Sequence, residues 1–560
     1  MRLLTALFLV ILLAAPVRAQ TPITHHMIAA AHPLAAEAGL SVLRDGGSAT
    51  DALIAAQMVL ALVEPQSSGI GGGAVALTYT AVDGRVEGWD GRETAPAAAT
   101  PDLFMGRDGK PMEYFAASLG GRAVGVPGTV RMLELMHKAH GKLPWDRLFV
   151  TAIRLAEGGF TVSARLSASI AADAEHLQHQ AAARSYFFTP EGTPMPAGRS
   201  LVNKRLAETL RAIATGGADA LYRGSIAADI ATTVRADPNA GLMTADDIAA
   251  YTPHKREPLC GTYRGQIVCG MGPPSSGGVG VLQILGLLQH FNLAGRDPDS
   301  ADVAHLLLEA EKLAYADRAM YLADSDFVPV PIRGLLDPAY LTQRAQAIDI
   351  DRANAAPRAG NPDFRNPGLA PMPPQPEHGT SHIAVVDDDG NAATMTTTVQ
   401  DPFGARIMVR GFLLNDELND FSFAPTQNGR TVANRVEGGK RPRSAMSPTL
   451  VFAPDGRLRI VAGSQGGGRI IGFVAQSLMR MIDFDMTPQQ ALSAPHIQTT
   501  GTVAELEADT RAADLAEALK ARGQTVRVIP VDSGQQAILI TPAGMLGGAD
   551  PRREGVALGD

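Results

Sequence analysis

Two threonines lie at the open end of a predicted β-hairpin, in a setting suited to nucleophilic chemistry. Residues 380–386 read T-S-H-I-A-V-V, residues 387–391 read D-D-D-G-N, and a threonine-rich run ends at Thr398. Strand-forming runs on both sides of an Asp-Gly turn predict a hairpin. If the turn centres on Asp389, Thr380 and Thr398 face each other, because they are equally far from it.

Thr380 is a candidate N-terminal nucleophile. It follows Gly379, which ends a proline-rich run. The Thr380 hydroxyl could attack the Gly379 carbonyl and cut the chain there. The freed α-amine could then act as base for the same hydroxyl, as an alternative to a histidine-based triad. Threonine-rich hairpins with Asp-Gly turns are also common in purely structural roles, so the pattern alone fits either reading.

The composition is that of a folded globular protein. The chain has 560 residues, of which 45% are hydrophobic and 19% charged, enough for a large buried core. Its many glycines and prolines favour a loop-rich α/β protein, in which a clear long helix is predicted over 300–322. The formal net charge of −8 argues against nucleic acid or an anionic membrane surface as the main partner.

The first residues resemble a secretory signal. Arg2 precedes an apolar run from Leu3 to Ala15, and small or branched residues lead up to a cut after Ala19. The run is short for a membrane span, although a membrane-anchored N-terminus is the alternative. We therefore expect residues 1–19 to be a signal peptide and the protein to be periplasmic or secreted, without a stable membrane span.

The two cysteines lie in a second predicted hairpin. Cys260 and Cys269 flank G-T-Y-R-G-Q-I-V, and a turn near Arg264–Gly265 would bring them roughly opposite each other. Export permits a disulfide between them. A pair of buried free thiols fits the sequence equally well.

The segment H-G-T-S-H-I-A-V-V-D-D-D-G-N-A at 378–392 resembles the processing site of the γ-glutamyltranspeptidases. Further segments resemble motifs of that family in the same order along the chain: R-E-T-A-P at 92–96, L-L-N-D-E-L-N-D-F-S at 413–422, K-R-P-R-S-A-M-S-P-T at 440–449 and G-S-Q-G-G-G-R-I-I at 463–471. The resemblance covers nearly the whole chain after the signal.

The resemblance implies a fold and a processing event. The fold would be the αββα N-terminal nucleophile hydrolase fold, in which two largely antiparallel sheets stack between helix layers. Cleavage between Gly379 and Thr380 would give a large chain, residues 20–379, and a small chain, residues 380–560, which stay associated. No metal or organic cofactor is implied.

The resemblance also implies roles for individual residues. Thr380 would be the nucleophile, Thr398 would hydrogen-bond to it, and the backbone N–H groups of Gly466 and Gly467 would form the oxyanion hole. The residues implied in substrate binding are Arg92 for the α-carboxylate of a γ-glutamyl donor, Glu417 and Asp420 for its α-amine, Ser444 as a hydrogen-bond donor to the carboxylate, and Gln400. Without the resemblance, Arg92 would be read as a solvated surface charge and the acidic pair as a solvated turn.

The sequence departs from the family pattern in two places. Ala445 follows Ser444 where the family often has a second serine, and the stretch between Asp420 and Lys440 is short and contains no Tyr or Trp. We therefore expect an open site that favours hydrolysis of γ-glutamyl amides such as glutathione over transfer to an amino acid or peptide. The alternatives are an acylase for glutaryl groups of the cephalosporin type and an inactive periplasmic binding protein.

Overall fold

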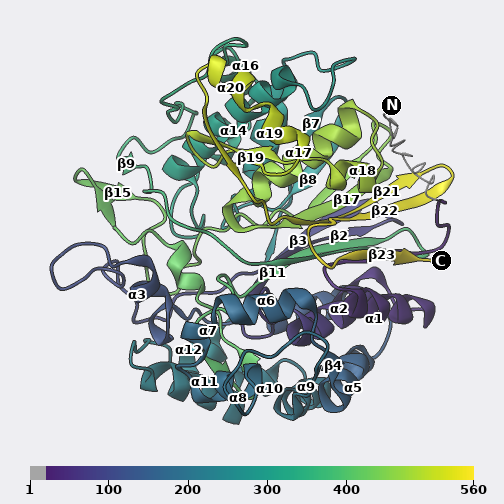
Figure 1. Ribbon diagram of the computed structural model, residues 1–560, viewed down its shortest axis with the longest axis vertical. Helices are drawn as coiled ribbons and strands as arrows, with labels where there is room; N and C mark the ends of the chain where they lie inside the picture. Colours follow the sequence, from purple (N-terminus) through teal and green to yellow (C-terminus); the bar gives the residue numbers. More distant parts are fainter. Residues whose placement is uncertain (1–20) are drawn as a thin grey trace, which may run out of the picture.

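The computed structural model describes residues 21–560, in which two antiparallel sheets stack face to face between layers of helices (Figure 1). The order of the seven-stranded sheet is β23 (Val556–Gly559), β1 (Met27–Ala30), β10 (Ser381–Val386), β11 (Ala392–Thr398), β2 (Gly73–Thr80), β3 (Arg85–Gly91) and β6 (His254–Arg256). The order of the six-stranded sheet is β22 (Gly544–Ala549), β21 (Gly534–Thr541), β17 (Leu458–Gln465), β16 (Thr449–Phe452), β8 (Gln266–Gly270) and β7 (Leu259–Tyr263).

Helices cover the outer face of each sheet. On the seven-stranded sheet, α1 (Pro33–Arg44) packs on β1, and α2 (Ala49–Val63) packs on β10 and β11. On the six-stranded sheet, α13 (Gly277–Leu288) and α17 (Ile470–Asp483) are in contact with the strands, and α14 (Ala301–Tyr321) packs on α13. This is the four-layer αββα arrangement that the resemblance implies.

The two sheets are held together by an apolar layer between them. Its buried side chains include Leu77 and Val386 from the first sheet and Leu450, Val461 and Ile538 from the second. Because the central strands β10 and β2 have a helix layer on one face and the other sheet on the other, their sequences are mostly apolar or small on both faces. α2 is also buried all round, as its apolar sequence predicts, and begins with a capping box between Ser48 and Asp51.

The predicted hairpin at 380–398 lies in the middle of the seven-stranded sheet. Ser381 pairs with Thr397 and Val386 with Ala392, which is the register predicted for a turn centred on Asp389. β11 also pairs with β2, so that Thr398 lies opposite Gly73. A central hairpin is a rigid support, because neighbouring strands and both sheet faces restrain it.

The second hairpin is formed by β7 and β8, and its cysteines are joined. Cys260 and Cys269 are direct cross-strand partners and form a disulfide. Arg264 and Gly265 make the turn with positive φ values of 50° and 79°. The alternative of two free thiols is therefore wrong.

The segment before Gly379, which looks exposed and irregular in the sequence, is exposed only in part. Within it, β9 (Leu369–Ala370) pairs with β15 (Arg430–Val432), which in turn pairs with β14 (Thr426–Gln427). Met372 is buried as well. The chain then runs without regular secondary structure through residues 371–380 to the start of β10.

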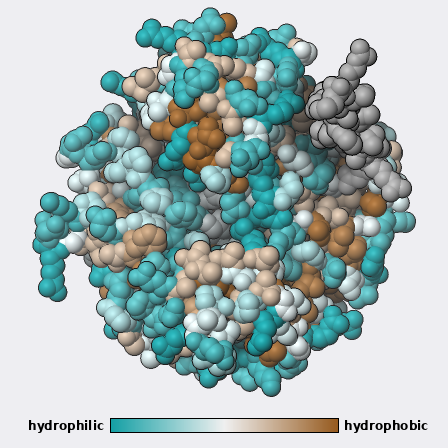
Figure 2. Space-filling model, in the orientation of Figure 1, coloured by the Kyte–Doolittle hydropathy of each residue, from teal (hydrophilic) through white to brown (hydrophobic). Residues whose placement is uncertain are grey.

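On the face in Figure 2, hydrophobic side chains form small groups among hydrophilic ones. Within residues 21–560, no helix has the length and hydrophobicity needed to cross a bilayer. The predicted signal, residues 1–19, lies outside the described residues.

The remaining α-helices of five or more residues in the described chain fill the layers and the lower part of Figure 1. On the side of the seven-stranded sheet these are α3 (Tyr114–Ser118), α4 (Thr129–His140), α5 (Val150–Gly158), α6 (Ala164–Ala172), α8 (Ala181–Phe187), α9 (Lys204–Gly216), α11 (Ser225–Ala236) and α12 (Ala245–Ala250). Near the six-stranded sheet lie α16 (Pro338–Ala345), α18 (Pro488–Ser493) and α20 (Ala516–Ala521).

Candidate active site

Thr380 lies where the two sheets meet, immediately before β10. The Thr380 side chain is buried, and its Oγ1 accepts a hydrogen bond from the backbone N–H of Gly466 at 3.2 Å. Gly466 follows the last residue of β17, which packs against β10 across the sheet interface. One predicted oxyanion donor therefore already contacts the candidate nucleophile.

The backbone at the predicted cleavage site is strained. Gly379 has a φ of 69° and Thr380 a φ of 112°. Positive φ is a genuine outlier for a β-branched residue and costs on the order of 1–3 kcal/mol. Gly379 is also pressed against Gln400, since a Cβ at position 379 would lie 1.6 Å from the Gln400 carbonyl oxygen. Only glycine fits there, and the strain is located at the bond that would break.

Thr398 is close to this site, but its hydroxyl has another partner. Its Oγ1 accepts a hydrogen bond from the backbone N–H of Gln400 at 2.7 Å. The predicted hydrogen bond between Thr398 and Thr380 is not formed in the uncut chain. Gln400 itself has a φ of 78°, and its side-chain amide donates to Asp420 at 2.7 Å and to Asn419 at 3.0 Å.

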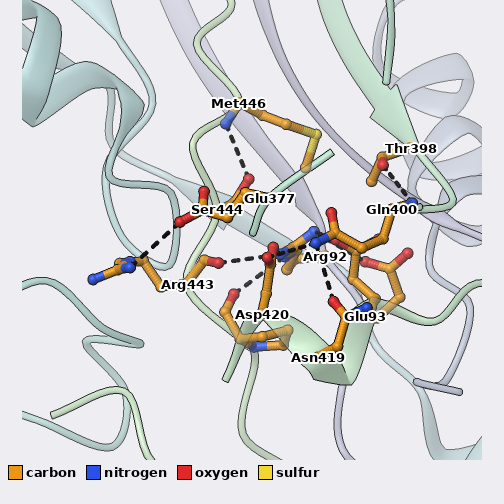
Figure 3. Close-up of polar contacts among 12 residues, drawn as sticks. Arg92, Glu93, Glu377, Thr398, Gln400, Asn419, Asp420, Arg443, Ser444 and Met446 are labelled. Carbon is orange, nitrogen blue, oxygen red and sulfur yellow. Dashed lines mark hydrogen bonds and ion pairs between the residues drawn. The ribbon is translucent and has the colours of Figure 1, made fainter. Parts of the chain in front are cut away.

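Arg92 lies at the centre of a buried group of charges (Figure 3). Its guanidinium is ion-paired with Glu417 and with Asp420, and it donates to the backbone carbonyls of Pro442 at 3.1 Å and Arg443 at 3.2 Å. The resemblance implies that Arg92 and the two acids hold opposite ends of a substrate. The structure brings the three together as predicted, but in the substrate-free chain they bind one another.

Burial changes the charge of the acids around Arg92. It raises the pKa of Asp420 to about 6 and the pKa of Glu93, whose carboxylate is 3.6 Å from Arg92, to about 7. Burial also raises the pKa of Glu417 well above its usual value. Burial acts against the charge of Arg92, but Glu417 and Asp420 keep its pKa raised. The group therefore combines a fixed cation with acids that release protons reluctantly.

Ser444 lies beside this group, on the loop before β16. Its Oγ accepts a hydrogen bond from the N–H of Met446 at 3.0 Å, and its carbonyl accepts from the N–H of Ser276 at 2.8 Å. Only about 10 Å³ of free space remains in the cavity between the predicted site residues. The residues lining this cavity include Arg92, Thr380, Thr398, Gln400, Glu417, Asp420, Ser444, Ala445 and Gly467.

Three charged residues of the site were missed by the sequence reasoning. Glu377 fills the same cavity and forms a bidentate ion pair with Arg318 of α14 at 2.8 and 2.9 Å. Arg443 approaches the same carboxylate at 3.5 Å. The sequence offered one signal for these residues, which is the position of Glu377 in a proline-rich run close to the predicted cleavage site.

The two histidines near Thr380 contact structural groups. His382 is fully buried between the hydroxyls of Thr394 and Thr396, at 3.1 and 2.9 Å. Burial lowers the pKa of His382 to about 3, so it is neutral at pH 7. His378 is half-exposed and pairs with Asp401 at 2.8 Å.

Comparison with known proteins places the chain among enzymes of similar architecture. The family described as Gamma-glutamyltranspeptidase matches residues 35–560. The glutathione hydrolase proenzyme of Bacillus subtilis (strain 168) is 39% identical over 547 residues, which cover 95% of this chain and 91% of that protein. The acylase ACY 1 proenzyme of Pseudomonas sp. (strain SE83) is 34% identical over 534 residues, which cover 93% of this chain and 91% of the relative.

The structural comparison agrees with these sequence matches. The crystal structure of cephalosporin acylase from Bacillus halodurans has a TM-score of 0.85 and 28% identity, with 99% of each chain covered. The matches therefore extend across both sheets and every segment that contributes to the site. The chain belongs to the γ-glutamyltranspeptidase family.

Proposed function

We propose that the chain cuts itself between Gly379 and Thr380 and then acts as a γ-glutamyl hydrolase and transferase with Thr380 as nucleophile. The observation that carries this proposal is the Thr380 hydroxyl, which is held by Gly466 N–H next to a strained peptide bond. In the cut, Thr380 Oγ1 attacks the Gly379 carbonyl carbon and the C–N bond breaks, which gives an ester. Water then hydrolyses the ester and leaves a Gly379 carboxylate and a free Thr380 α-amine.

The proposed large and small chains would remain associated because they share both sheets. Residues 20–379 supply β1, β2, β3 and β6 to the first sheet and β7 and β8 to the second. Residues 380–560 supply β10 and β11 in the middle of the first sheet, and β16 and β17 beside β8 in the second. Neither chain could bury its strands alone.

In turnover, the free α-amine takes the proton of the Thr380 hydroxyl as Oγ1 attacks the γ-carbonyl of the donor. The resulting oxyanion accepts hydrogen bonds from the N–H groups of Gly466 and Gly467. The tetrahedral intermediate collapses to a γ-glutamyl ester, and the leaving amine takes the proton. Water, or the amine of an amino acid or peptide, then attacks the ester and releases the enzyme.

We further propose glutathione and related γ-glutamyl amides as donors, with water as the favoured acceptor. The relative from Bacillus subtilis named glutathione hydrolase proenzyme supports the donor. The α-carboxylate would bind Arg92 and Ser444, and the α-amine would bind Glu417, Asp420 and Gln400. The short stretch after Asp420 supports access for water. The signal-like residues 1–19 support a periplasmic or secreted location.

The mass of the purified protein tests the cut. We expect the wild type to give two chains, the smaller beginning at Thr380, and Thr380→Ala to give one. A folded wild type that stays in one piece would contradict self-processing and favour an inactive binding protein.

A glutaryl acylase is the second candidate. Arg92 is already paired with Glu417 and Asp420, so these two carboxylates are not free to bind an α-amine. The relatives named as acylases also support this candidate. The ratio of kcat/KM for γ-glutamyl-p-nitroanilide and glutaryl-p-nitroanilide separates the two, because these donors differ only in the α-amine. A higher value for the γ-glutamyl donor supports the first proposal, and a higher value for the glutaryl donor supports the acylase.

A further inference from the structure

Glu377 occupies a binding site for a carboxylate built by two buried arginines. Arg318 donates to its two oxygens at 2.9 and 2.8 Å, and Arg443 lies 3.5 Å from one of them. The Arg318 and Arg443 side chains are only 7% and 5% exposed. Burial alone would raise the pKa of Glu377, but the two guanidiniums hold it below its usual value. Glu377 is therefore an ionised carboxylate in a cationic pocket.

Other contacts hold both arginines in place without Glu377. Arg318 Nε donates to Ser276 Oγ at 2.8 Å, and Arg443 Nη1 donates to the Arg318 carbonyl at 3.2 Å. The buried Nε of Arg443 has no hydrogen-bond partner. If Glu377 left, these contacts would hold the two arginines in place. Their positive charges would then have no anionic partner.

The charge balance around Arg318 and Arg443 differs from that around Arg92. Arg92 is within 3.6 Å of three buried acids, which all belong to fixed parts of the fold: Glu93, Glu417 and Asp420. The only acid in ion-pair contact with Arg318 or Arg443 in the described chain is Glu377. The charges of Arg318 and Arg443 are therefore balanced by Glu377, which lies close before the proposed cut.

Glu377 and a substrate cannot occupy the site together. The cavity that Glu377 lines with Thr380 has only about 10 Å³ of free space, roughly the space of one water molecule. The Glu377 carbonyl also covers Gly467, where an added Cβ would lie 2.0 Å from its oxygen. The segment with Glu377 must therefore move before an acyl group can reach Thr380 and the oxyanion hole.

We propose that Arg318 and Arg443 form a carboxylate subsite of the processed enzyme, which binds the free carboxylate of a glutaryl-type acyl group, one without an α-amine, after Glu377 has left. This inference rests on the proposed processing at Gly379. The subsite lies on the acyl side of the site, because Arg443 adjoins Ser444 and Arg318 reaches the Ser444 carbonyl through Ser276. The ligand class is an acyl chain of the length of glutaryl that ends in a carboxylate and has no α-amine, whereas the α-carboxylate of a γ-glutamyl donor would bind Arg92 and Ser444.

The subsite can be tested without any processing, in chains that carry Thr380→Ala. A second change, Glu377→Ala, removes a CH₂–COO⁻ unit, for which acetate is the matched replacement. We expect acetate to raise the melting temperature of the double variant relative to chloride at equal ionic strength. Acetamide, which is neutral, should have no such effect. The Thr380→Ala chain should not respond, and adding Arg443→Leu should remove the response.

A double variant that responds equally to acetate, acetamide and chloride would overturn the proposal. So would a response that survives Arg443→Leu. Acetate binding together with a wild type that is never cut would support the subsite and contradict the proposed function, so that the two failures are distinguishable.

The processed enzyme gives a second test, which does not depend on the stability of the uncut variants. We expect Arg443→Leu to reduce kcat/KM for glutaryl-p-nitroanilide about 10- to 100-fold, mainly through KM. The kcat/KM for the matched neutral donor, in which an amide replaces the free carboxylate, should change less than about threefold. Arg443→Lys should restore part of the glutaryl activity. An equal loss for both donors would indicate a structural role and overturn the proposal, as would no loss for either.

Discussion

The backbone N–H of Gly466 donates a hydrogen bond to the Thr380 hydroxyl at 3.2 Å. The two residues come from different sheets, so the nucleophile and its stabilising donor are fixed by how the sheets stack rather than by one flexible loop. Thr380 is held with a positive φ directly after Gly379. The uncut chain thus stores strain at the bond whose cleavage would release the α-amine.

Gly379→Ala should block or greatly slow the cut. The added Cβ would lie 1.6 Å from the Gln400 carbonyl oxygen, so the peptide bond must shift away from the attacking hydroxyl. The fraction of cut chain over time, measured by mass, checks this. Gly46→Ala is a matched control, since Gly46 also has a positive φ, 83°, but has open space around it. Normal cutting of the Gly379 variant would show that this contact does not position the bond.

Arg92→Leu should destabilise the uncut Thr380→Ala chain by on the order of 3–5 kcal/mol at pH 7, because it leaves Glu417 and Asp420 buried without their cation. The free energy of unfolding in urea measures the loss. Adding Glu417→Gln and Asp420→Asn should recover part of it, because the amides need neither a cation nor a proton to be neutral in the buried site. If these two amide substitutions recover none of the lost stability, the loss comes from packing and the charge argument fails.

The hairpin could be predicted from the sequence because its signals are local, whereas the site segments were identified through the resemblance to the γ-glutamyltranspeptidases. Asp389 and Gly390 mark a turn, and the flanking runs then determine the register that pairs Ser381 with Thr397. The glycines at 466 and 467 likewise mark a sharp change of direction after a strand. Each of these features depends on neighbouring residues, and local patterns report them well.

The contacts that fill the site could not be predicted, because they join distant parts of the chain. The Arg92–Asp420 pair spans 328 residues and the Arg318–Glu377 pair spans 59. Each carboxylate has several arginines within reach in the fold, and only the packing decides which one it contacts. The sequence also cannot show that Thr398 bonds to Gln400 rather than to Thr380, since a hydroxyl has several partners at similar distances.

The stability of the uncut chain should fall in acid because of His382. Burial lowers its pKa to about 3 in the folded state, against about 6.5 in an unfolded chain. The unfolded state therefore binds the proton first, and stability is lost as the pH falls from about 6.5 towards 3. Between pH 7 and pH 5 this contribution amounts to about 2 kcal/mol.

Urea unfolding at the two pH values, in the Thr380→Ala background, measures this effect. His382→Gln should lower stability at pH 7 and reduce the loss between pH 7 and pH 5, whereas His290→Gln, at an exposed position, should leave that loss unchanged. An unaltered pH dependence in the His382 variant would assign the acid sensitivity to other groups.

Ala445→Ser should improve the binding of donors that carry an α-carboxylate. Ala445 lines the same cavity as Ser444 and Arg92, so a hydroxyl there would add a second donor beside the proposed carboxylate position. One such hydrogen bond is worth about 0.5–1.5 kcal/mol, which predicts a KM for γ-glutamyl-p-nitroanilide about 2- to 12-fold lower. The KM for a donor whose α-carboxylate is replaced by an amide should change much less. An equal fall for both donors would place the new hydroxyl elsewhere, and a higher KM with lower stability would show that the buried position next to Ser444 has no room for it.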